Sequence, residues 1–228
     1  METQNRSDLR PNNALYYRFI KRLFDIVFSS VTLILLSSLM IIIALAIWIT
    51  DGRPIFFSQK RAGLNGKPFY IYKFRSMVIN APELLNEHLK SIRQNGPVWE
   101  IPDDPRVTKI GAFLRSTDLD ELPQLVNILR SEMSVVGPRP LTDYETNLLT
   151  PYQRQRLLMK PGMTGYWQIH KNENISFDKR TEIDLNYIRK ADIWTDFKIL
   201  MKSIPAILTG KGRSKQTKWA ENRQRLTR

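Results

Sequence analysis

The stretch IVFSSVTLILLSSLMIIIALAIWIT, Ile26 to Thr50, is uncharged, and Asp25 and Asp51 bound it on either side. An α-helix rises about 1.5 Å per residue, so roughly 20 apolar residues cross a hydrocarbon core of about 30 Å. A cleavable signal peptide has a shorter apolar core and begins nearer the N-terminus. The stretch therefore predicts a membrane helix, and a buried core helix is the alternative.

Both flanks of this stretch are basic, with Arg18, Lys21 and Arg22 before it and Arg53, Lys60 and Arg61 after it. Basic flanks favour the cytoplasmic side, and a straight span would place one of them on the opposite side. A helix that enters the bilayer and returns keeps both in the cytoplasm. The hydroxyls of Ser37 and Ser38 can satisfy backbone groups at a bend. We therefore expect a re-entrant membrane helix.

The remaining chain alternates predicted helices with short extended segments and turns. Residues 1–13 are polar and expected to be disordered, residues 14–51 form the anchor, and residues 52–210 form one catalytic domain. Two extended segments around the turn at 62–66 predict a β-hairpin. Helices are expected at 81–94, 108–115, 122–130, 151–159 and 177–189, and loops at 101–106, 137–140 and 161–165. The expected fold class is α/β and mostly helical.

Apolar residues then recur on one helical face: Trp194, Phe197, Leu200, Met201, Ile204, Ile207 and Leu208, with Lys198 and Lys202 beside them. This pattern fits a helix packed on the core or an amphipathic helix lying in the bilayer interface, and both interpretations stay open. Residues 211–228 carry seven basic residues and one acid, which predicts a flexible basic tail near anionic lipids.

The composition narrows the chemistry. The chain has 228 residues, a formal charge of +13 and no cysteine, which excludes disulfides, iron–sulfur clusters and thiolate zinc sites. A basic protein can bind nucleic acid, an anionic membrane or a phosphorylated substrate. Nucleic-acid binding needs a groove element or a stacking platform beyond charge; the aromatics of PFYIYKF, residues 68–74, could imitate one, but they follow a membrane segment, so we expect no nucleic-acid partner. The glycine-rich phosphate loop, the dinucleotide fingerprint and the metalloprotease motif are also absent.

The densest polar cluster is RSTDLDELPQL, residues 115–125. Pro123 is tolerated in a first helical turn, so Asp120 and Glu121 are expected at or near a helix start. Acids there can simply stabilise the helix end. Alternatively, one carboxylate attacks or positions a phosphate while the other holds Mg²⁺, a cation that favours carboxylates and substrate phosphates.

Phosphate chemistry also needs cations, because positioning and charge stabilise its transition state. The candidates are Lys60, Arg61, Lys73, Arg75, Arg106, Lys109, Arg115 and Arg139. The two prolines around Arg139 fix its backbone and lower the cost of aiming its side chain. The residues alone thus suggest phosphate chemistry at a membrane.

Five segments together resemble the bacterial sugar transferases, the small single-domain polyprenyl-phosphate phosphoglycosyl transferases. They are KRLFDIV, PIFFSQKRAG, KPFYIYKFRSM, LRSTDLDELPQLVNILRSEMSVVGPRP and KPGMTGYWQI, and the similarity runs from about Lys21 to about Gly210. The resemblance implies a monotopic enzyme of the bacterial inner membrane with its catalytic domain facing the cytoplasm. It also implies transfer of a sugar-1-phosphate from a UDP-sugar to undecaprenyl phosphate with release of UMP, the first membrane step of exopolysaccharide, capsule or O-antigen synthesis.

The resemblance also implies residue roles. Asp120 matches the nucleophile that forms a covalent phosphosugar, and Glu121 matches the acid that helps to hold Mg²⁺. Matching the phosphate-binding cations are Arg115, Arg139, Arg61, Lys73 and Arg75. Relatives break the membrane helix at Ser-Pro, whereas this chain has Ser37 and Ser38 there. The sugar, the glycan pathway and the formation of a homo-oligomer are left open by the sequence.

Overall fold

The computed structural model describes residues 9, 11–12, 14–81, 83–84, 104–166, 168 and 176–209. The helical elements are α1 (Leu15–Asp51), α3 (Lys109–Ser116), α4 (Gln124–Leu129), α5 (Asp143–Asn147), α6 (Phe177–Arg189) and α7 (Ile193–Thr209), with 3-10 turns η1 (Leu64–Gly66), η2 (Leu119–Glu121) and η3 (Gln153–Leu158). The strands are β1 (Phe56–Ala62), β2 (Pro68–Phe74), β3 (Ser134–Val136) and β4 (Gly162–Thr164). The expected fold, mostly helical with short sheets, is confirmed for this part of the chain.

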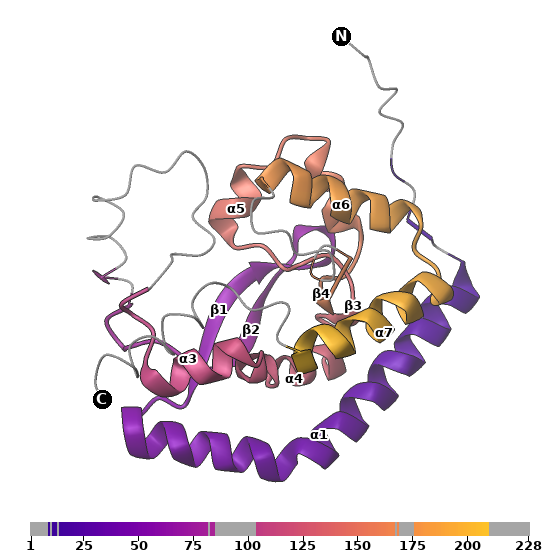
Figure 1. Cartoon of the computed structure of the whole chain (residues 1–228). Coiled ribbons are helices and arrows are strands. Elements are labelled where there is room, and N and C mark those ends of the chain that lie inside the picture. The colour runs from indigo at the N-terminus through magenta and orange to yellow at the C-terminus, as the bar shows by residue number, and fades with distance from the viewer. Residues whose placement is uncertain are drawn as a thin grey trace.

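Helix α1 is one continuous helix of 37 residues that contains the whole uncharged stretch. It has the length and apolarity to cross a membrane, and only 11% of its most apolar window is buried. A core helix of a water-soluble domain would be mostly buried, so this alternative does not fit. Figure 1 shows α1 bent into two arms that enclose the rest of the domain. Just past its middle, the exposed Ser37 hydroxyl donates to the carbonyl of Ile34 at 2.8 Å, a local bond that favours helix bending.

The first arm of α1 is attached to the domain by charged side chains. Lys21 pairs with Asp196 of α7 at 2.6 Å. The buried Asp25 carboxylate accepts from the Ser134 hydroxyl at 3.0 Å and from the backbone N–H of Val135 at 2.9 Å. These bonds hold the start of α1 against β3 and α7.

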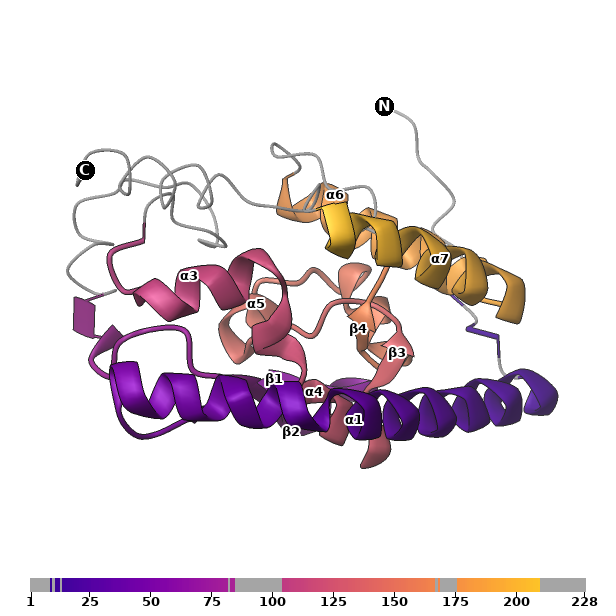
Figure 2. The ribbon, with the colours of Figure 1, turned by 60° about the horizontal axis from the view of Figure 1, so that its bottom comes forward.

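The second arm contacts the same domain. Ile43 and Ile47 are buried four residues apart, so they lie on one face of the helix. At the end of α1, the guanidinium of Arg75 donates to the carbonyls of Asp51 and Gly52 at 2.6 and 2.9 Å. In Figure 2, α1 runs along one side of the domain for its whole length. Both arms are therefore anchored on one folded unit.

The predicted hairpin is confirmed. β1 and β2 pair antiparallel, with Phe56 opposite Phe74 and Ala62 opposite Pro68. The turn between them contains Asn65 and Gly66, both with positive φ, a conformation that glycine and asparagine tolerate best. On the other side of β2, the buried Asn127 of α4 extends the sheet through its side chain.

The Asn127 amide accepts from the backbone N–H of Tyr72 at 3.0 Å and donates to the carbonyl of Tyr70 at 2.7 Å. These are the two groups that a further strand would have bonded. A helix is thereby fixed to the edge of the hairpin, and η2 and α4 are held beside β2.

The second sheet was not predicted. We expected a loop at 161–165, but Gly162–Thr164 forms β4 and pairs in parallel with β3. The two strands can approach because of glycine: a Cβ on Gly162 would lie 2.0 Å from the backbone nitrogen of Gly137. Three-residue strands carry too little side-chain periodicity to be recognised in a sequence.

Among the predicted helices, the one at 177–189 is confirmed with the same bounds. The helix expected at 108–115 begins after the N-cap residue Thr108, whose hydroxyl accepts from the N–H of Gly111. The segment at 151–159 is the 3-10 turn η3 rather than an α-helix. Most of the N-terminal segment 1–13, expected to be disordered, and most of the predicted helix 81–94 lie outside the described residues. So do the basic tail 211–228 and residues 101–103 of the predicted loop 101–106.

Helix α7 combines the two interpretations of its apolar face. Ile199 is buried in the core cluster, whereas Trp194, Phe197 and Met201 are 61%, 47% and 43% exposed. Trp194 and Phe197 stack with ring centroids 5.5 Å apart, and Lys198 lies over the Trp194 ring. One side of α7 therefore packs on the domain, and its other side presents aromatic and basic groups suited to a bilayer interface.

Candidate active site

The hairpin supplies one wall of the site. Arg61 lies opposite Phe69 and Gln59 opposite Ile71, so the odd-numbered residues of both strands share a face. Lys73 follows Ile71 on that face by the two-residue period of a strand. A cation from each strand is thereby directed to the same side of the hairpin.

The acidic pair lies where the prediction put it, one turn before a helix. Asp118 adopts a left-handed backbone conformation, η2 follows, and Pro123 leads into α4. Neither helical start shows a side-chain capping bond. Asp120 and Glu121 lie in the first turn of η2, so the interpretation that they stabilise a helix end stays open beside the catalytic one.

Glu121 is paired with the hairpin. Its carboxylate lies 2.5 Å from the Lys73 ammonium, with side chains 20% and 19% exposed. Burial alone would raise the pKa of Glu121, but Lys73, Arg139 and a hydrogen bond from Gln124 outweigh it and lower the pKa to about 2. Glu121 is therefore a carboxylate throughout the physiological pH range.

Asp120 has the opposite environment. It is only 7% exposed, and burial raises its pKa to about 6; Lys73 and Arg115 lower it, and the charge of Glu121 raises it. Adjacent carboxylates whose environments push their pKa values apart are suited to different roles. Asp120 is ionised at neutral pH but poorly compensated, so a cation or an electrophile beside it is favoured.

The opposite wall is the loop Gly137–Pro140, which carries Arg139. Each residue of this loop makes one backbone bond to another segment. The N–H of Gly137 donates to Thr164 at 2.9 Å, and the carbonyl of Pro138 accepts from Gly162 at 2.8 Å. The carbonyl of Arg139 accepts from Arg156 at 3.0 Å, and that of Pro140 accepts from Arg61 at 3.3 Å. The loop is rigidly placed.

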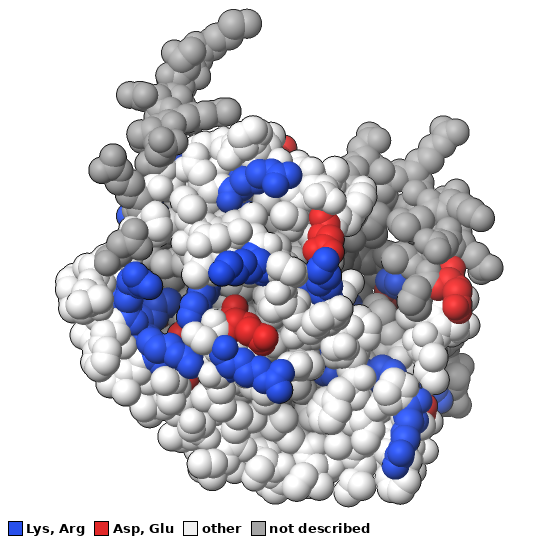
Figure 3. Space-filling model, turned by 180° about the vertical axis from the view of Figure 1, so that it is seen from behind, with Lys and Arg blue, Asp and Glu red and all other residues white. Residues whose placement is uncertain are grey.

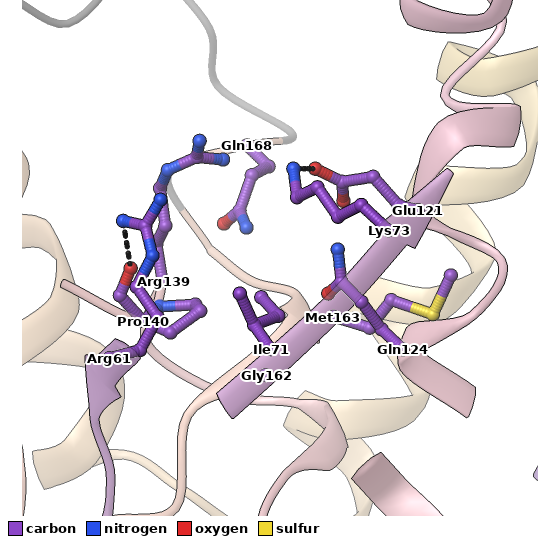
Figure 4. Close-up of a pocket in the computed structure, with 10 residues that line it drawn as sticks. All are labelled: Arg61, Ile71, Lys73, Glu121, Gln124, Arg139, Pro140, Gly162, Met163 and Gln168. Atoms are coloured by element: carbon purple, nitrogen blue, oxygen red, sulfur yellow. Dashed lines mark hydrogen bonds and ion pairs between the residues drawn. The ribbon is translucent and has the colours of Figure 1, made fainter. Parts of the chain in front are cut away.

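These elements border a small pocket that is open to solvent. It is lined by Arg61, Ile71, Lys73, Glu121, Gln124, Arg139, Pro140, Gly162, Met163 and Gln168 (Figure 4). Three cations thus face one carboxylate. Burial and the nearby charge of Arg139 lower the pKa of Arg61 to about 10, the direction expected where positive charge is in excess. Figure 3 shows acidic side chains in a hollow surrounded by basic ones, as a phosphate-binding site requires.

The structure brings together most of the predicted site residues. Arg61, Lys73, Glu121 and Arg139 line the pocket. Asp120, which precedes Glu121 in the chain, is buried and is not among the lining residues that the structure describes.

Two predicted phosphate ligands lie elsewhere. Arg115 is in the last turn of α3, near enough to Asp120 to lower its pKa. Arg75 is 5% exposed and its guanidinium binds the last carbonyls of α1, so in this structure it fastens the anchor and does not line the pocket.

Some lining residues were not predicted. Gln124 follows Glu121 by three positions and therefore shares its side of the helical start. Gln168 ends the segment KPGMTGYWQ, and its buried side-chain oxygen has no hydrogen-bond partner among the described residues. Met163 and Gly162 enter through β4, which the sequence pattern did not reveal.

The donor set can be tested against Mg²⁺, which the resemblance implies. No group of three His, Asp or Glu side chains gathers within the described part of the chain. The site therefore offers one or two carboxylates, those of Asp120 and Glu121. This is the protein share that Mg²⁺ takes when substrate phosphates and water complete its shell. The uncompensated charge on Asp120 also favours a cation, so the residues fit the ion in that mode.

Comparison with known proteins gives the family. Residues 16–210 match the family model described as bacterial sugar transferase. The exopolysaccharide production protein ExoY of Rhizobium meliloti strain 1021 is 39% identical over 196 residues, covering 84% of this chain and 87% of the relative.

Two longer relatives have more specific names. The undecaprenyl-phosphate galactose phosphotransferase of Salmonella typhimurium is 41% identical over 199 residues, 86% of this chain and 42% of the relative. The UDP-glucose:undecaprenyl-phosphate glucose-1-phosphate transferase of Escherichia coli strain K12 is 40% identical over 196 residues, 82% of this chain and 40% of the relative. The chain spans less than half the length of these two proteins. The family model and the ExoY alignment nevertheless each cover most of this chain. The chain belongs to the bacterial sugar transferase family.

Proposed function

We propose that the protein transfers a sugar-1-phosphate from a UDP-sugar to undecaprenyl phosphate and releases UMP. The observation that carries this proposal is the pocket itself: Arg61, Lys73, Arg139 and the Glu121 carboxylate line it, and the adjacent residue Asp120 is buried. Excess positive charge suits a diphosphate, and a carboxylate pair suits covalent phosphoryl transfer. The names of the Salmonella and Escherichia relatives support the same donor and acceptor classes.

The reaction proceeds in two displacements. An oxygen of the Asp120 carboxylate attacks the phosphorus attached to the sugar, and the bond from that phosphorus to the bridging oxygen breaks, so UMP leaves with the bridging oxygen. A phosphate oxygen of undecaprenyl phosphate then attacks the same phosphorus. The acyl-phosphate bond breaks, Asp120 is restored as a carboxylate, and the product is a lipid diphosphosugar.

The surrounding residues hold and neutralise the phosphates. Arg61 and Arg139 lie near one end of the pocket and Lys73 near the other (Figure 4), so these cations can bind oxygens on two sides of a diphosphate. Glu121 keeps Lys73 in place through their ion pair, and Glu121, with the adjacent Asp120, would hold Mg²⁺. The ion, when bound, neutralises charge on the transferring phosphate. Removing it with a chelator should abolish UMP release, and adding Mg²⁺ should restore it.

We also infer that α1 enters the bilayer and returns, so that the domain faces the cytoplasm at an inner membrane. Both arms of α1 are fixed to one domain, and the domain lies inside the bend (Figure 1). A helix whose start and end are both bonded to one polar domain cannot cross the bilayer as a straight span without taking that domain with it. Labelling of cysteines introduced at Leu15 and Arg53 tests this; opposite sides of the membrane would mean a straight span.

The nucleotide product separates this function from its closest rival. A glycosyltransferase that moved only the sugar would release UDP instead of UMP. A membrane scaffold without enzymatic activity would bind lipid and leave nucleotide sugars intact. Purified protein in lipid nanodiscs, incubated with undecaprenyl phosphate, Mg²⁺ and a panel of UDP-sugars, should release UMP with at least one of them; release of UDP would contradict the proposal.

A further inference from the structure

One buried ion pair takes no part in the proposed reaction. Arg156 of η3 is 4% exposed and Asp184 of α6 is 1% exposed, and the Arg156 guanidinium donates to the Asp184 carboxylate. Burial raises the pKa of Asp184 to about 6 although the Arg156 charge and hydrogen bond oppose it. The pair lies behind the loop that carries Arg139, outside the set of described residues that line the pocket.

This pair is poorly designed for stability alone. The second carboxylate oxygen of Asp184 and the Nε of Arg156 are buried with no hydrogen-bond partner among the described residues. A buried ion pair offsets its desolvation cost only when the remaining hydrogen-bonding groups are satisfied, and apolar residues of similar size often serve stability equally well. We therefore expect the pair to have a role other than cross-linking η3 to α6.

The other contact of Arg156 indicates that role. The same nitrogen that binds Asp184 also donates to the backbone carbonyl of Arg139 at 3.0 Å. The neighbouring carbonyl of Pro140 is bound by Arg61, itself a pocket residue. Asp184 fixes the guanidinium of Arg156, and that guanidinium fixes the backbone from which the Arg139 side chain extends into the pocket (Figure 4).

We propose that Arg156 and Asp184 are positioning residues that hold Arg139 where it binds a donor phosphate. The identity of this ligand rests on the proposed function, whereas the geometric claim concerns any diphosphate in the pocket. A displacement of about 1 Å in a catalytic constellation can cost a hundredfold in rate. Loss of the Arg156 contact should therefore weaken diphosphate binding by roughly tenfold or more while the fold is kept.

The experiment uses UDP, which carries both phosphates but no sugar, and full-length protein in nanodiscs. The Arg156→Met/Asp184→Leu double variant removes both charges and leaves no buried ion unpaired. We expect its unfolding temperature to match or exceed that of the wild type, and its affinity for UDP to fall roughly tenfold. If the pair only stabilised the fold, a double variant of full stability would bind UDP as the wild type does. Arg189→Lys is the matched control, because Arg189 joins α6 to Tyr152 at the surface and does not contact the loop.

A double-mutant cycle tests whether the effect passes through Arg139. In an Arg139→Ala background, the same double substitution should change UDP affinity by no more than about twofold, because there is no side chain left to position. If the double substitution lowered UDP affinity roughly tenfold in the Arg139→Ala background as well, the proposal would be overturned. If the double variant does not fold, the cycle is measured with Arg156→Lys in place of the double substitution. Lysine keeps the charge that pairs with Asp184 but lacks the planar guanidinium that also binds the Arg139 carbonyl. UMP release by the wild type tests the proposed function separately, since UDP binding does not depend on turnover.

Discussion

The ion pair between Lys73 and Glu121 gives a prediction whose size follows from the structure. Its two side chains are 19% and 20% exposed, and the N–O distance is 2.5 Å. The pKa of Glu121 falls from 4.5 to about 2 although burial alone would raise it. At about 1.36 kcal/mol per pKa unit, the depressed pKa corresponds to about 3 kcal/mol of stability at neutral pH.

The substitution Lys73→Met removes the cation and leaves the Glu121 carboxylate partly buried and unpaired. We expect the free energy of unfolding at pH 7 to fall by up to about 3 kcal/mol, because Lys73 is the largest of the groups that lower this pKa, while Arg139 and Gln124 remain. Because the folded-state pKa of Glu121 is depressed, this stability is present above pH 4.5 and is lost as the pH falls towards about 2. The difference in the free energy of unfolding between the variant and the wild type should therefore decrease as the pH is lowered from 4.5 towards about 2.

Denaturant unfolding in metal-free detergent solution measures this difference. The control is Lys60→Met, which removes a lysine of the same hairpin from a pair with Asp143 at 3.2 Å, with side chains 49% and 56% exposed. Exposed pairs contribute about 0–1 kcal/mol. If Lys73→Met destabilised the protein no more than Lys60→Met, the account of Glu121 as a buried carboxylate held by Lys73 would be wrong.

Three further substitutions test the fold and the site. Because the pKa of Asp120 is raised to about 6, ionisation of this side chain destabilises the folded protein as the pH rises through that value. The substitution Asp120→Asn should therefore raise the unfolding temperature of the metal-free protein at about pH 8 and change it little near pH 4. Thermal scans at the two pH values measure this difference. Asn127→Ala removes the partner of two partly buried backbone groups of β2, so it should lower the free energy of unfolding by about 1–3 kcal/mol in denaturant titrations. A neutral result would mean that α4 is not fixed through this amide. Gly162→Ala places a methyl group 2.0 Å from the Gly137 nitrogen, so it should separate β3 from β4 and abolish UMP release; a fully active variant would contradict the close approach of these strands.

The elements that the sequence predicted best are those with strong local patterns. Helix α1 follows from a long uncharged run, the hairpin from two extended segments around a glycine-rich turn, and α6 from a helical pattern over 177–189. The short parallel pair β3 and β4 depends on backbone contact between Gly137 and Gly162, far apart in the chain, and leaves no periodic signal.

The site divides in the same way. The Asp120–Glu121 pair and the proline-flanked Arg139 were predictable from dense local chemistry. The partners of Lys73 and Arg75 could not be predicted, because the two residues lie only two positions apart in a basic segment. Tertiary contacts alone decide that Lys73 pairs with Glu121 and that Arg75 binds the end of α1. Arg156 and Asp184 have no distinguishing pattern in a chain with 35 basic and 22 acidic residues, and only their burial marks them out.

The central claim is that Asp120 carries the transferred phosphosugar, and trapping that adduct tests it most directly. Protein incubated with Mg²⁺ and a UDP-sugar, without undecaprenyl phosphate, should release about one UMP per active site by the ping-pong route. Mass spectrometry of its peptides should find a hexose phosphate on Asp120. The Asp120→Asn variant should give neither product while remaining folded and membrane-bound. Equal UMP release by that variant, or an adduct on another residue, would contradict the account.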